Sequence, residues 1–551
     1  MKKVYFADFE TTQPNKDNKV FVYLWCILSG NEVYTGKTLE TFINKLETLN
    51  GVVYFHNLKF DFSYIHYYLI KNNIEYKLLE KKGTIYQVKL FDIQLRDSMN
   101  FLPMSLKEVG ENYCTKYQKT SIDYNVQEGH EATEEEITYC INDCRVVEEG
   151  LTNYLNTLEE ILTSVNCVKS VKKLHKKLTN AGIAFEAFKE LSMFEQLCPK
   201  TSKQQYDAWK GSYRGGFVYS NPKGIVTNVK MIDCNSMYPH IYSTIEMPYG
   251  NAFKFNDWEK LERYKFYIVN IFIKYDLKPG YIPIIGGGVS KYGGINYKSS
   301  SNGEFEELTL CNIDLELIKR FYNCEIILRS GWGFDTKKEF FKEYAETFIK
   351  VKNANKGIKR NVAKVMLNSP YGKTAMNGLG EIKKYDIDEK HHVVKGEVVG
   401  YEVNDDVFQY LPIAIQITAG ARKLLLETAE TIGFENVYYM DTDSIKFKDV
   451  PTDIKCDPDR LGAWKDEGYC ELFKTIAPKK YVYYSEGKIK FTCAGFNKKV
   501  LSEELEHGKE VSYKKAKELM QMFSPGLELD CLQSKVVEGG RALIPVKKQI
   551  K

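Results

Sequence analysis

Hydrophobic positions in the first part of the chain form short β-rich runs, separated by amphipathic segments. The runs are KKVYFADF (2–9), NGVVYFHN (50–57) and TIYQVKLFDIQL (84–95). Their β-branched and aromatic residues are typical of strands. We therefore predict a mixed sheet flanked by helices over about the first 120 residues.

A long helix is predicted to begin near Thr133. The sequence TEEE allows a capping box between Thr133 and Glu136, and acidic residues in a first turn suit the helix dipole. Helical periodicity then continues, with interruptions, to about Leu197. We interpret this stretch as the passage out of the first domain.

The middle of the chain alternates between turn signals and apolar runs. YRGG, NPKG and MPYG surround the strand-like KGIVTNVKMIDCNSMYP (223–239), and the Gly- and Tyr-rich region 245–339 is typical of loops on a small β-containing module. Two helices are predicted next, joined near residues 353–357. Pro370 should end the second, because proline lacks an amide proton and disfavours helix in the residue before it.

Composition indicates a globular protein of several domains. The chain has 551 residues, of which 43% are hydrophobic and 27% charged, enough for about three or four domains. The longest apolar runs, 266–273 and 411–421, are shorter than the roughly 18 residues of a membrane helix, so no membrane segment is expected. The N-terminal apolar stretch is soon interrupted by acids, so it does not predict a secretory signal.

Cysteine usage indicates a cellular compartment, and the distribution of charge indicates basic segments. Thirteen cysteines without a CxxC pair favour reduced thiols and a cytosolic compartment. Cys140 and Cys144 lie on the predicted helix, and we interpret them as packing residues rather than metal ligands. The net charge is only +4, but lysines crowd 168–178, 349–360 and the C-terminal tail. Each lysine run alone is also typical of a solvated helix face.

A first set of carboxylates comes from three separated segments. Asp8 and Glu10 share one face of a predicted strand, where they repel each other unless a cation lies between them. Taken alone, this pair is more typical of an exposed strand face than of a metal site. Further acids follow at helical spacing from Asn57 and Tyr139. The complete set, Asp8, Glu10, Asp61 and Asp143 with Tyr139, predicts a two-metal phosphodiesterase centre, with oxygen ligands for Mg²⁺ or Mn²⁺ and a phenol to orient water.

A second set lies further along the chain. Asp233 ends a predicted strand, while Asp441 and Asp443 occupy a predicted hairpin, although a DTD sequence alone also fits a turn. Two metals about 3.5–4 Å apart between these strands would hold a triphosphate and an attacking hydroxyl in line. The helix between them carries three cations on roughly one face, where they could meet triphosphate oxygens or form a surface basic stripe. These are Lys352, Arg360 and Lys364.

Taken in order, the motifs resemble those of the protein-primed branch of family B DNA polymerases, found in small tailed bacteriophages with linear genomes. The resemblance runs from Met1 to the end. It implies an α/β and α+β multidomain fold, with an RNase H-like exonuclease domain followed by a right-hand polymerase of palm, fingers and thumb with two insertions. The implied boundaries are exonuclease 1–175, palm 176–244 and 410–493, first insertion 245–339, fingers 340–375, second insertion 376–409 and thumb 494–551.

The N-terminal motifs resemble the exonuclease motifs of that family. They are YFADFETT, YFHNLKFD and YCINDC, and they imply that Asp8, Glu10, Asp61 and Asp143 bind metals. Tyr139 would orient water, and Lys119 in QKTSIDY would assist catalysis. The resemblance further implies that Tyr124 binds single-stranded DNA and that His56, Asn57, Phe60 and Ser98 hold the 3′ end or the priming protein.

The remaining motifs resemble those of the polymerase half. YRGGF implies template contacts and primer transfer by Tyr213, Arg214, Gly215 and Gly216. DCNSMYP resembles motif A, with Asp233 as metal ligand and Tyr238 under the sugar, excluding a 2′-hydroxyl. KVMLNSPYG resembles motif B, with Lys364 on the triphosphate, Asn368 and Tyr371 around the nascent pair, and Lys352 and Arg360 as further triphosphate-facing cations.

YMDTDS resembles motif C, in which Asp443 is a metal ligand and Asp441 lies beside it. ITAGAR and PKKYVYY imply DNA or primer contacts by Thr418, Arg422, Lys479 and Tyr481. Two departures are mild: Pro370 in the motif B loop, and Gly420 where the family usually has a bulkier residue. The second insertion diverges most from the family.

The resemblance implies a DNA-directed DNA polymerase with 3′–5′ proofreading, which replicates a linear phage genome in the cytoplasm of the bacterial host. Two Mg²⁺ ions per active site are expected, with Mn²⁺ as an alternative. The expected partners are template and primer DNA, dNTPs and a terminal protein that acts as primer, with the polymerase a monomer or a heterodimer with that protein. The first insertion would contact the terminal protein, and the second would encircle downstream DNA for processivity and strand displacement.

Three alternatives remain at the level of sequence: a nucleic-acid-primed polymerase, a noncatalytic DNA-binding factor, and a nuclease with an inert polymerase site. Both acid sets are complete. Since buried carboxylates without compensation are costly, their retention favours an enzyme.

Overall fold

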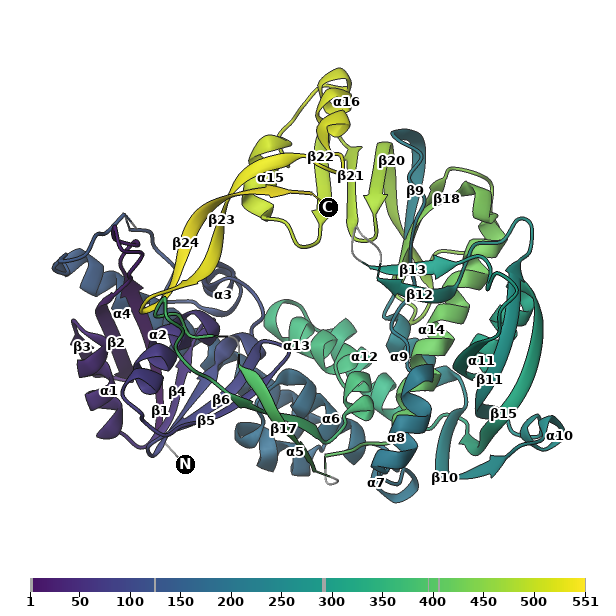
Figure 1. Ribbon diagram of the computed structural model, residues 1–551, viewed down its shortest axis with the longest axis horizontal. Helices are drawn as coiled ribbons and strands as arrows, with labels where there is room; N and C mark the ends of the chain where they lie inside the picture. Colours follow the sequence, from purple (N-terminus) through teal and green to yellow (C-terminus); the bar gives the residue numbers. More distant parts are fainter. Residues whose placement is uncertain (1–2, 123–124, 290–293, 395, 405–406, 551) are drawn as a thin grey trace.

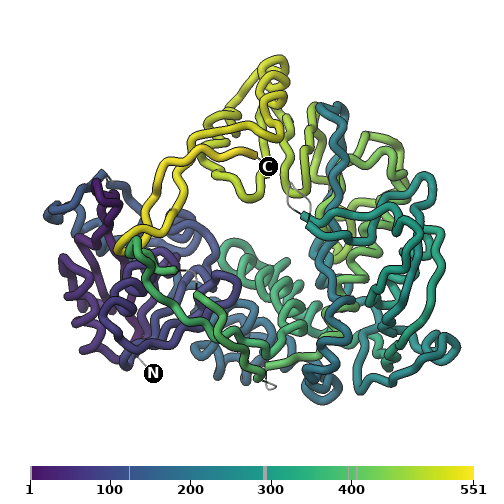
Figure 2. The backbone as a smooth tube through the Cα atoms, in the orientation of Figure 1, coloured from purple at the N-terminus to yellow at the C-terminus, as the bar shows by residue number. Residues whose placement is uncertain are grey.

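The computed structural model describes residues 3–122, 125–289, 294–394, 396–404 and 407–550. The N-terminal domain and a central sheet lie at opposite sides of the molecule (Figure 1). A helical region joins them on one side, and the C-terminal hairpin returns from the central sheet to the N-terminal domain on the other (Figure 2).

The N-terminal domain is built on a seven-stranded mixed sheet, as the sequence pattern predicts. The strand order is β3 (Glu32–Gly36), β2 (Val22–Ser29), β1 (Lys3–Thr11), β4 (Gly51–Phe55), β7 (Ile93–Asp97), β6 (Thr84–Leu90) and β5 (Lys77–Lys81). Only the β1–β4 and β4–β7 pairings are parallel within this sheet.

The two faces of this sheet are covered by different helices. Alternation along β1 directs Tyr5, Ala7 and Phe9 into one apolar core with α1 (Leu39–Glu47) and α2 (Leu58–Lys71). Phe6 belongs instead to the core under α3 (Leu106–Tyr113) and α4 (Glu134–Ser164). The alternation therefore puts Asp8 and Glu10 on the α4 side.

Helix α4 begins where the capping box predicts. Thr133 is its N-cap, the Thr133 side chain accepts from the Glu136 amide, and the Glu136 side chain reaches back to the cap. The chain then continues through short helices. They are α5 (Val168–Lys173), η2 (Leu174–Lys176), α6 (Asn180–Glu190), α7 (Phe194–Leu197), α8 (Lys203–Trp209) and η3 (Lys210–Ser212).

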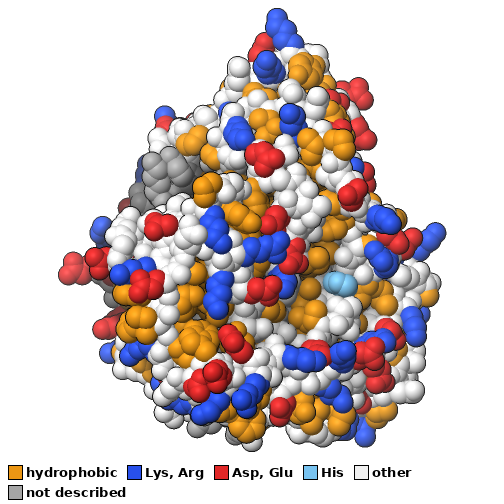
Figure 3. All heavy atoms as spheres, turned by 90° about the vertical axis from the view of Figure 1, so that its right-hand side faces the viewer, with side chains coloured by type: hydrophobic (Ala, Val, Ile, Leu, Met, Phe, Trp, Pro, Cys, Tyr) orange, Lys and Arg blue, Asp and Glu red, His pale blue; other side chains and the backbone are white. Residues whose placement is uncertain are grey.

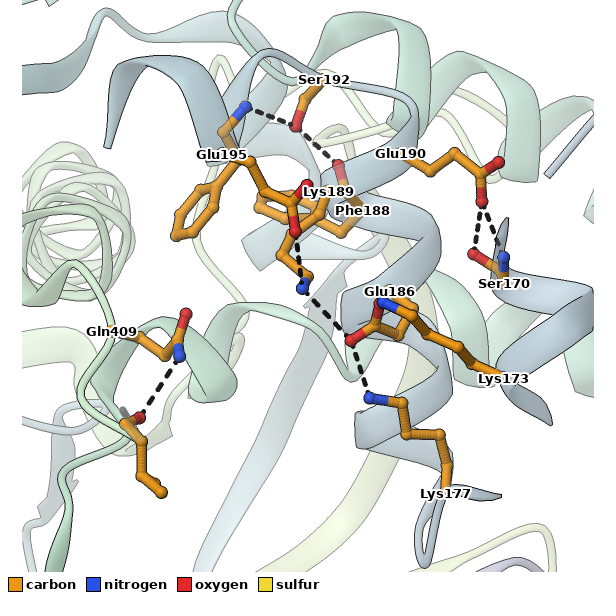
Figure 4. A network of polar contacts seen from close by, with 12 residues as sticks. Ser170, Lys173, Lys177, Glu186, Phe188, Lys189, Glu190, Ser192, Glu195 and Gln409 are labelled. Carbon is orange, nitrogen blue, oxygen red and sulfur yellow. Dashed lines mark hydrogen bonds and ion pairs between the residues drawn. The ribbon is translucent and has the colours of Figure 1, made fainter. Parts of the chain in front are cut away.

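A buried glutamate ties these connecting helices together (Figure 4). Glu186 on α6 receives Lys173 and Lys177 at 2.7 Å and Lys189 at 3.2 Å. Burial alone would raise the pKa of Glu186, but the hydrogen bonds from Lys173 and Lys177 and the charge of Lys189 lower it to about 2. The same helix packs against the segment that leads into helix Lys342–Ala354. There the rings of Phe188 and Phe341 stack with their centroids 4.1 Å apart.

The central sheet brings together strands that are distant in sequence. Its antiparallel order is β22 (Lys488–Cys493), β21 (Lys480–Ser485), β20 (Trp464–Ala477), β9 (Val226–Cys234), β19 (Ser444–Lys448), β18 (Val437–Asp441) and β8 (Val218–Ser220). Helices α9 (Met237–Thr244) and α14 (Leu411–Ile432) pack beside it, with η5 (Phe434–Asn436) leading into β18. In the described part of the chain, no helix is long and apolar enough to cross a membrane.

Region 245–339 is more regular than the predicted loops, because the alternating run 266–273 pairs on both sides. Its four-stranded antiparallel sheet, called here the insertion sheet, has the order β10 (Met247–Phe255), β15 (Tyr322–Lys337), β11 (Phe266–Leu277) and β14 (Glu306–Cys311). The region also contains α10 (Trp258–Leu261), α11 (Asn312–Phe321) and the small hairpin β12 (Ile285–Val289) and β13 (Ile295–Lys298). Among the described side chains on this side of the molecule, basic and acidic groups are intermixed (Figure 3).

The predicted helical pair is α12 (Lys342–Ala354) and α13 (Gly357–Asn368), and the second helix ends two residues before Pro370. The chain continues through η4 (Tyr371–Ala375) into the hairpin of β16 (Leu379–Lys384) and β17 (Glu397–Val403). We call this the second hairpin. It is anchored on the N-terminal domain, because Lys383 and the Tyr385 hydroxyl contact Glu80 at 3.2 and 3.1 Å, and the Tyr385 ring packs edge-on against His66.

The C-terminal segment consists of α15 (Lys498–Glu504), α16 (Tyr513–Met522) and the hairpin of β23 (Glu528–Val537) and β24 (Gly540–Gln549). The tip of this hairpin docks on the N-terminal domain. The Val20 amide donates to the Glu538 carbonyl at 3.1 Å, and the Tyr64 hydroxyl donates to the Arg541 carbonyl at 2.5 Å. A Cβ atom at Gly540 would lie 2.5 Å from the Tyr64 ring, so the close approach requires glycine there.

Replacing Glu186 by Gln should destabilise the connecting helices. We expect Glu186→Gln to lower the free energy of unfolding by about 1.5–3 kcal/mol at neutral pH, because charge-assisted hydrogen bonds are lost. The pKa of Glu186 is depressed from 4.5 to about 2, so its contribution is complete above pH 4.5 and is lost as the pH falls toward 2. Urea unfolding of both proteins should therefore show a difference that shrinks near about pH 3.

The matched control is Glu195→Gln. Glu195 contacts Lys189 at the exposed end of the same network, so its loss should cost about 0–1 kcal/mol. A Glu186→Gln effect that stays constant across this pH range would contradict an ion-pair origin.

Replacing Gly540 by Ala should loosen the docked hairpin tip. The added methyl group meets the Tyr64 ring, and overpacking of this kind costs about 1–3 kcal/mol, so the Val20 amide should exchange about tenfold faster or more. Hydrogen–deuterium exchange of the peptide that contains Val20 measures this. Leu543→Ala, an exposed change on the same strand, should leave the exchange unaltered; equal protection in all three proteins would refute the docking contact.

Candidate active sites

The first carboxylate set converges between the N-terminal sheet and two helices. Asp8 and Glu10 project from β1, Asp61 lies in the first turn of α2, and Asp143 comes from α4. Glu10, Asp61 and Asp143 are 7%, 3% and 2% exposed. The structure thus brings together all four acids predicted from three separated segments, and we call this group the first site.

Mutual repulsion and burial dominate the electrostatics of the first site. Burial raises the pKa of Asp8, and the Asp143 charge raises it further. The pKa of Glu10 rises through burial and then through Asp8 and Asp143, while that of Asp61 rises through burial and Asp8. Ionisation of the set therefore requires a compensating cation.

One cationic side chain already faces the site. Lys119 contacts both the Tyr139 hydroxyl and Oδ2 of Asp143, which puts the predicted lysine and tyrosine beside the acids. Oδ1 of Asp143 is buried and has no hydrogen-bond partner among the described residues. An orphaned buried carboxylate oxygen beside other acids fits a bound cation.

The predicted 3′-end residues fall into two groups. Asn57 is exposed at the start of α2 with φ 72°, and it lines a cavity of about 420 Å³ together with His56, Asp8, Lys119 and Asp143. Phe60 is half-buried and packs edge-on with Tyr64. Tyr124 lies outside the described residues.

Ser98 requires a correction to the sequence-based prediction. It is fully buried, donates to the Phe55 carbonyl at 2.9 Å and contacts Nδ1 of His56 at 2.9 Å. Nε2 of His56 lies 2.8 Å from the Met104 carbonyl. Ser98 therefore orients His56 from behind, because its burial leaves it no surface for DNA.

The second carboxylate set forms at adjacent strands of the central sheet. Asp233 lies near the end of β9, opposite Ser444 of β19, and Asp443 lies in the turn between β18 and β19. The Cys234 amide donates to the Asp443 carbonyl at 2.7 Å, which fixes the turn against β9. The predicted hairpin is confirmed, and we call Asp233 and Asp443 with their cleft the second site.

Asp233 has a raised pKa of about 6, caused first by burial and then by Asp443 and Glu467. The pKa of Asp443 is raised mainly by burial. Glu467 and Asp459 are further acids that line this cleft, and sequence reasoning missed both. Glu467 is the one whose charge acts on Asp233. Its only signal was an acid in the polar stretch KDEG, and the pairing of β20 with β9 brings it beside Asp233.

A cleft of about 690 Å³ opens in front of Asp233 and Asp443, and residues of the central sheet and of the helical pair line it. All the predicted nucleotide contacts line it: Tyr238, Lys352, Arg360, Lys364, Asn368 and Tyr371. The rings of Tyr238 and Tyr371 stack 4.2 Å apart. Burial and the charges of Arg360 and Lys364 lower the pKa of Lys352. The side of the cleft that carries these three residues is therefore cationic, and a bound anion would offset its charge.

Asp441 plays a different part from its neighbour Asp443. Both of its carboxylate oxygens accept from Nζ of Lys479, at 3.0 and 2.9 Å, and the Tyr439 hydroxyl also reaches it. It does not line the cleft. The rings of Tyr481 and Tyr439 pack at a tilt, with their centroids 4.8 Å apart. The predicted primer-strand residues Lys479 and Tyr481 are thus tied to the motif that carries Asp443.

The loop YRGG is held against the second site. The Thr442 amide donates to the Phe217 carbonyl at 2.9 Å, and a Cβ atom at Gly216 would lie 2.5 Å from the Thr442 hydroxyl oxygen. The pKa of Tyr213 is raised to about 12, mainly by burial. Burial likewise lowers the pKa of Arg214, while Gly215 has open space where a Cβ atom would lie.

Thr418 and Arg422 also require a correction. They are 2% and 6% exposed inside the molecule, so neither presents a surface to DNA. Thr418 donates to the Ala414 carbonyl within its own helix, and Arg422 donates to the carbonyls of Arg214 and Gly215 at 2.7 and 2.8 Å.

Arg422 is also paired with Asp314 of α11, through nitrogen–oxygen distances of 3.0 and 2.6 Å. It therefore positions the YRGG loop rather than binding DNA itself. Gly420, on the same helix, packs where a Cβ atom would meet Ile241 at 2.8 Å, which explains the small residue.

Comparisons with known proteins agree with this architecture. The family model of DNA polymerase type B, organellar and viral, matches residues 43–133 and 123–408. The DNA polymerase of Bacillus phage Nf is 30% identical over 538 residues, covering 89% of each chain, and that of Bacillus phage phi29 is 28% identical over 562 residues, covering 91% of this chain and 93% of the relative.

The solved structure of phi29 DNA polymerase with primer-template DNA and incoming nucleotide superposes with a TM-score of 0.85 at 26% identity, covering all of both chains. Family match, relatives and fold all agree. The chain therefore belongs to the organellar and viral DNA polymerases of type B, and it is a DNA-directed DNA polymerase.

Proposed function

We propose that this polymerase replicates a linear phage genome by protein priming and strand displacement, and that it proofreads with a separate 3′–5′ exonuclease site. The observation that carries the proposal is the presence of two carboxylate clusters in separate cavities, of which the second alone faces a wall of Lys352, Arg360 and Lys364. One cluster suits hydrolysis of a single strand end, and the other suits transfer from a triphosphate.

The donor sets fit divalent cations at both sites. Polymerases of this family generally use divalent metals, and hard carboxylate oxygens suit Mg²⁺, with Mn²⁺ as the alternative. Asp8, Glu10, Asp61 and Asp143 would hold ions at the first site, and Asp233 and Asp443 at the second, two ions at each. When bound, the ions would supply charge neutralisation at phosphate and activation of the attacking oxygen.

At the second site, a primer 3′-hydroxyl or a hydroxyl of the priming protein attacks the α-phosphate of a dNTP, and pyrophosphate leaves. Lys364, Lys352 and Arg360 offset the charge of the triphosphate. Tyr238 stacks on Tyr371 below the place of the sugar, where it leaves no room for a 2′-hydroxyl. Asn368 contributes to the pocket around the nascent pair.

At the first site, the chain's own residues orient the water that cleaves a mispaired terminal nucleotide. The Tyr139 hydroxyl is held by Lys119 beside Asp143. It can accept a hydrogen bond from that water or donate one to it. Asn57, which lines the cavity, and the nearby Phe60 hold the frayed 3′ end, while His56 is kept in place by Ser98. The product is a nucleoside monophosphate.

In this proposal, the insertion 245–339 contacts the terminal protein and the second hairpin supports strand displacement. Support comes from the phage relatives and from the anchoring of the second hairpin on Glu80 and His66 of the N-terminal domain. DNA template and primer and dNTPs are the other partners, and the enzyme would work in the cytoplasm of the infected bacterium, alone or as a heterodimer with the terminal protein. Extension that starts only from nucleic-acid primers would favour the nucleic-acid-primed alternative.

Single alanine substitutions should separate the two activities. We expect Asp443→Ala to reduce extension of a labelled primer by roughly 10²- to 10³-fold or more while 3′ degradation persists, and Asp8→Ala to do the reverse. Denaturing gels with Mg²⁺, with and without dNTPs, measure both. The matched control is Asp466→Ala, an exposed acid beside Glu467 that does not line the cleft, which should retain both activities.

Loss of both activities from either active-site substitution would contradict separate sites. Wild-type protein that binds DNA but neither extends nor degrades it would contradict catalysis altogether.

Detaching the second hairpin should impair strand displacement selectively. Tyr385→Ala removes the hydrogen bond to Glu80 and the ring contact with His66, worth about 1–2 kcal/mol, and so shifts the docked fraction roughly tenfold. Extension on a single-stranded template should continue, while extension through a downstream duplex should fall. Tyr401→Ala, an exposed change on the same hairpin, should affect neither. Equal losses on both templates would contradict the assignment.

A further inference from the structure

A cysteine thiol lies among the acids of the first site. Cys140 is on α4, one helical turn before Asp143 and therefore on the same face. Its side chain is fully buried, and its thiol donates a hydrogen bond to the Asp8 backbone carbonyl, with an Sγ–O distance of 3.7 Å. The sequence pattern predicted only packing for this thiol, because its spacing to Cys144 resembles no metal motif.

Three donor atoms converge at this point. One carboxylate oxygen from Asp8, one from Glu10 and Sγ of Cys140 all lie within 4.8 Å of one another. In a tetrahedral zinc site, with bonds of about 2.3 Å to sulfur and 2.0 Å to oxygen, such donor atoms lie about 3.5 Å apart. Small side-chain adjustments would therefore bring the three atoms around one ion.

A buried carboxylate oxygen near these donors lacks a hydrogen-bond partner among the described residues. Oδ1 of Asp143 is buried and unpartnered among the described residues, although Lys119 contacts the other oxygen. Asp143 is 2% exposed, so water does not readily satisfy it. Cys140 and Asp143 share one face of α4, so a cation held by the three converging donors would lie on the face that carries Asp143.

The second site also has a thiol, but with different surroundings. Cys234 follows Asp233 on β9 and lines the second cleft, where its thiol donates to the Gly462 carbonyl at 3.4 Å. Among the described residues, no thiol converges with two carboxylates at the second site as Cys140 does at the first.

Sulfur changes which ions a site prefers. Thiolate ligands favour Zn²⁺, Cd²⁺ and Co²⁺, whereas carboxylate-only sites suit Mg²⁺ and Mn²⁺. We propose that Asp8, Glu10 and Cys140 form a binding site for a thiophilic divalent cation, of the Zn²⁺ or Cd²⁺ class, which competes with Mg²⁺ at the first site. On binding, the Cys140 thiol loses its proton to solvent and the sulfur becomes a ligand.

The binding of this cation stands apart from catalysis, but its consequence rests on the proposed function. A tightly held thiophilic ion would fill the first site with the wrong geometry and stop 3′ degradation. Extension at the second site would continue at the same ion concentration. Low concentrations of Zn²⁺ or Cd²⁺ would thus convert a proofreading polymerase into one that only extends.

The test is the absorption spectrum of the full-length protein with one equivalent of Co²⁺. A thiolate ligand gives an intense charge-transfer band in the near ultraviolet, which carboxylates do not give. We expect the band in wild type and its loss in both Cys140→Ser and Cys140→Ala. Three matched variants should keep it: Cys144→Ser on the same helix, Cys234→Ser at the second site and the exposed Cys456→Ser.

Affinity and activity give independent readouts. Calorimetric titration with Cd²⁺ should show about tenfold or more weaker binding to Cys140→Ser than to wild type. Cd²⁺ should inhibit 3′ degradation at lower concentration than extension in wild type, and this gap should narrow in Cys140→Ser. Primer extension by the variants reports that they are folded.

A wild-type protein without the band would overturn the inference, as would a band that survives both Cys140 substitutions. The spectrum does not depend on hydrolysis. If 3′ degradation with Mg²⁺ is absent while the band is present, the proposed exonuclease fails and the metal site stands. If 3′ degradation is present without the band, the metal site fails and the proposed exonuclease stands.

Discussion

Repulsion between buried carboxylates is the constraint on which both active sites depend. Strand pairing and helix packing hold these like charges close together in buried positions. Burial first, and then the neighbouring acid, raises the pKa of Asp8 and Asp233 above the ordinary range. Such an arrangement is costly unless cations share the space. This cost is one reason for the proposal that the acids are metal ligands, held in place by the surrounding structure.

The two sites use different frames. The first lies between a mixed sheet and the helices α2 and α4, where Lys119 offers one fixed positive charge. The second lies at the turn of a hairpin and faces a separate pair of helices that carries three cations. The three cations at the second site suit the high charge of a triphosphate. The single lysine at the first site suits a strand end that carries one scissile phosphate.

Buried polar contacts connect the second site to distant segments. Arg422 joins Asp314 of the insertion to the carbonyls of the YRGG loop, and that loop contacts the turn that bears Asp443. Lys479 reaches the same turn through Asp441. Elements that the sequence suggests as independent DNA contacts are in part supports for one another, which explains why several of them are buried.

The sequence alone determined the order and chemistry of the motifs, the capping box of Thr133, the end of the helix before Pro370 and the four acids of the first site. These follow from local rules, because periodicity, caps and proline act within a few residues. Tertiary structure decided the rest. Glu467 joined Asp233 through strand pairing, Arg422 turned inward onto a loop, and Cys140 came to lie beside Asp8. Each depends on contacts between residues more than 130 positions apart, which no local pattern encodes.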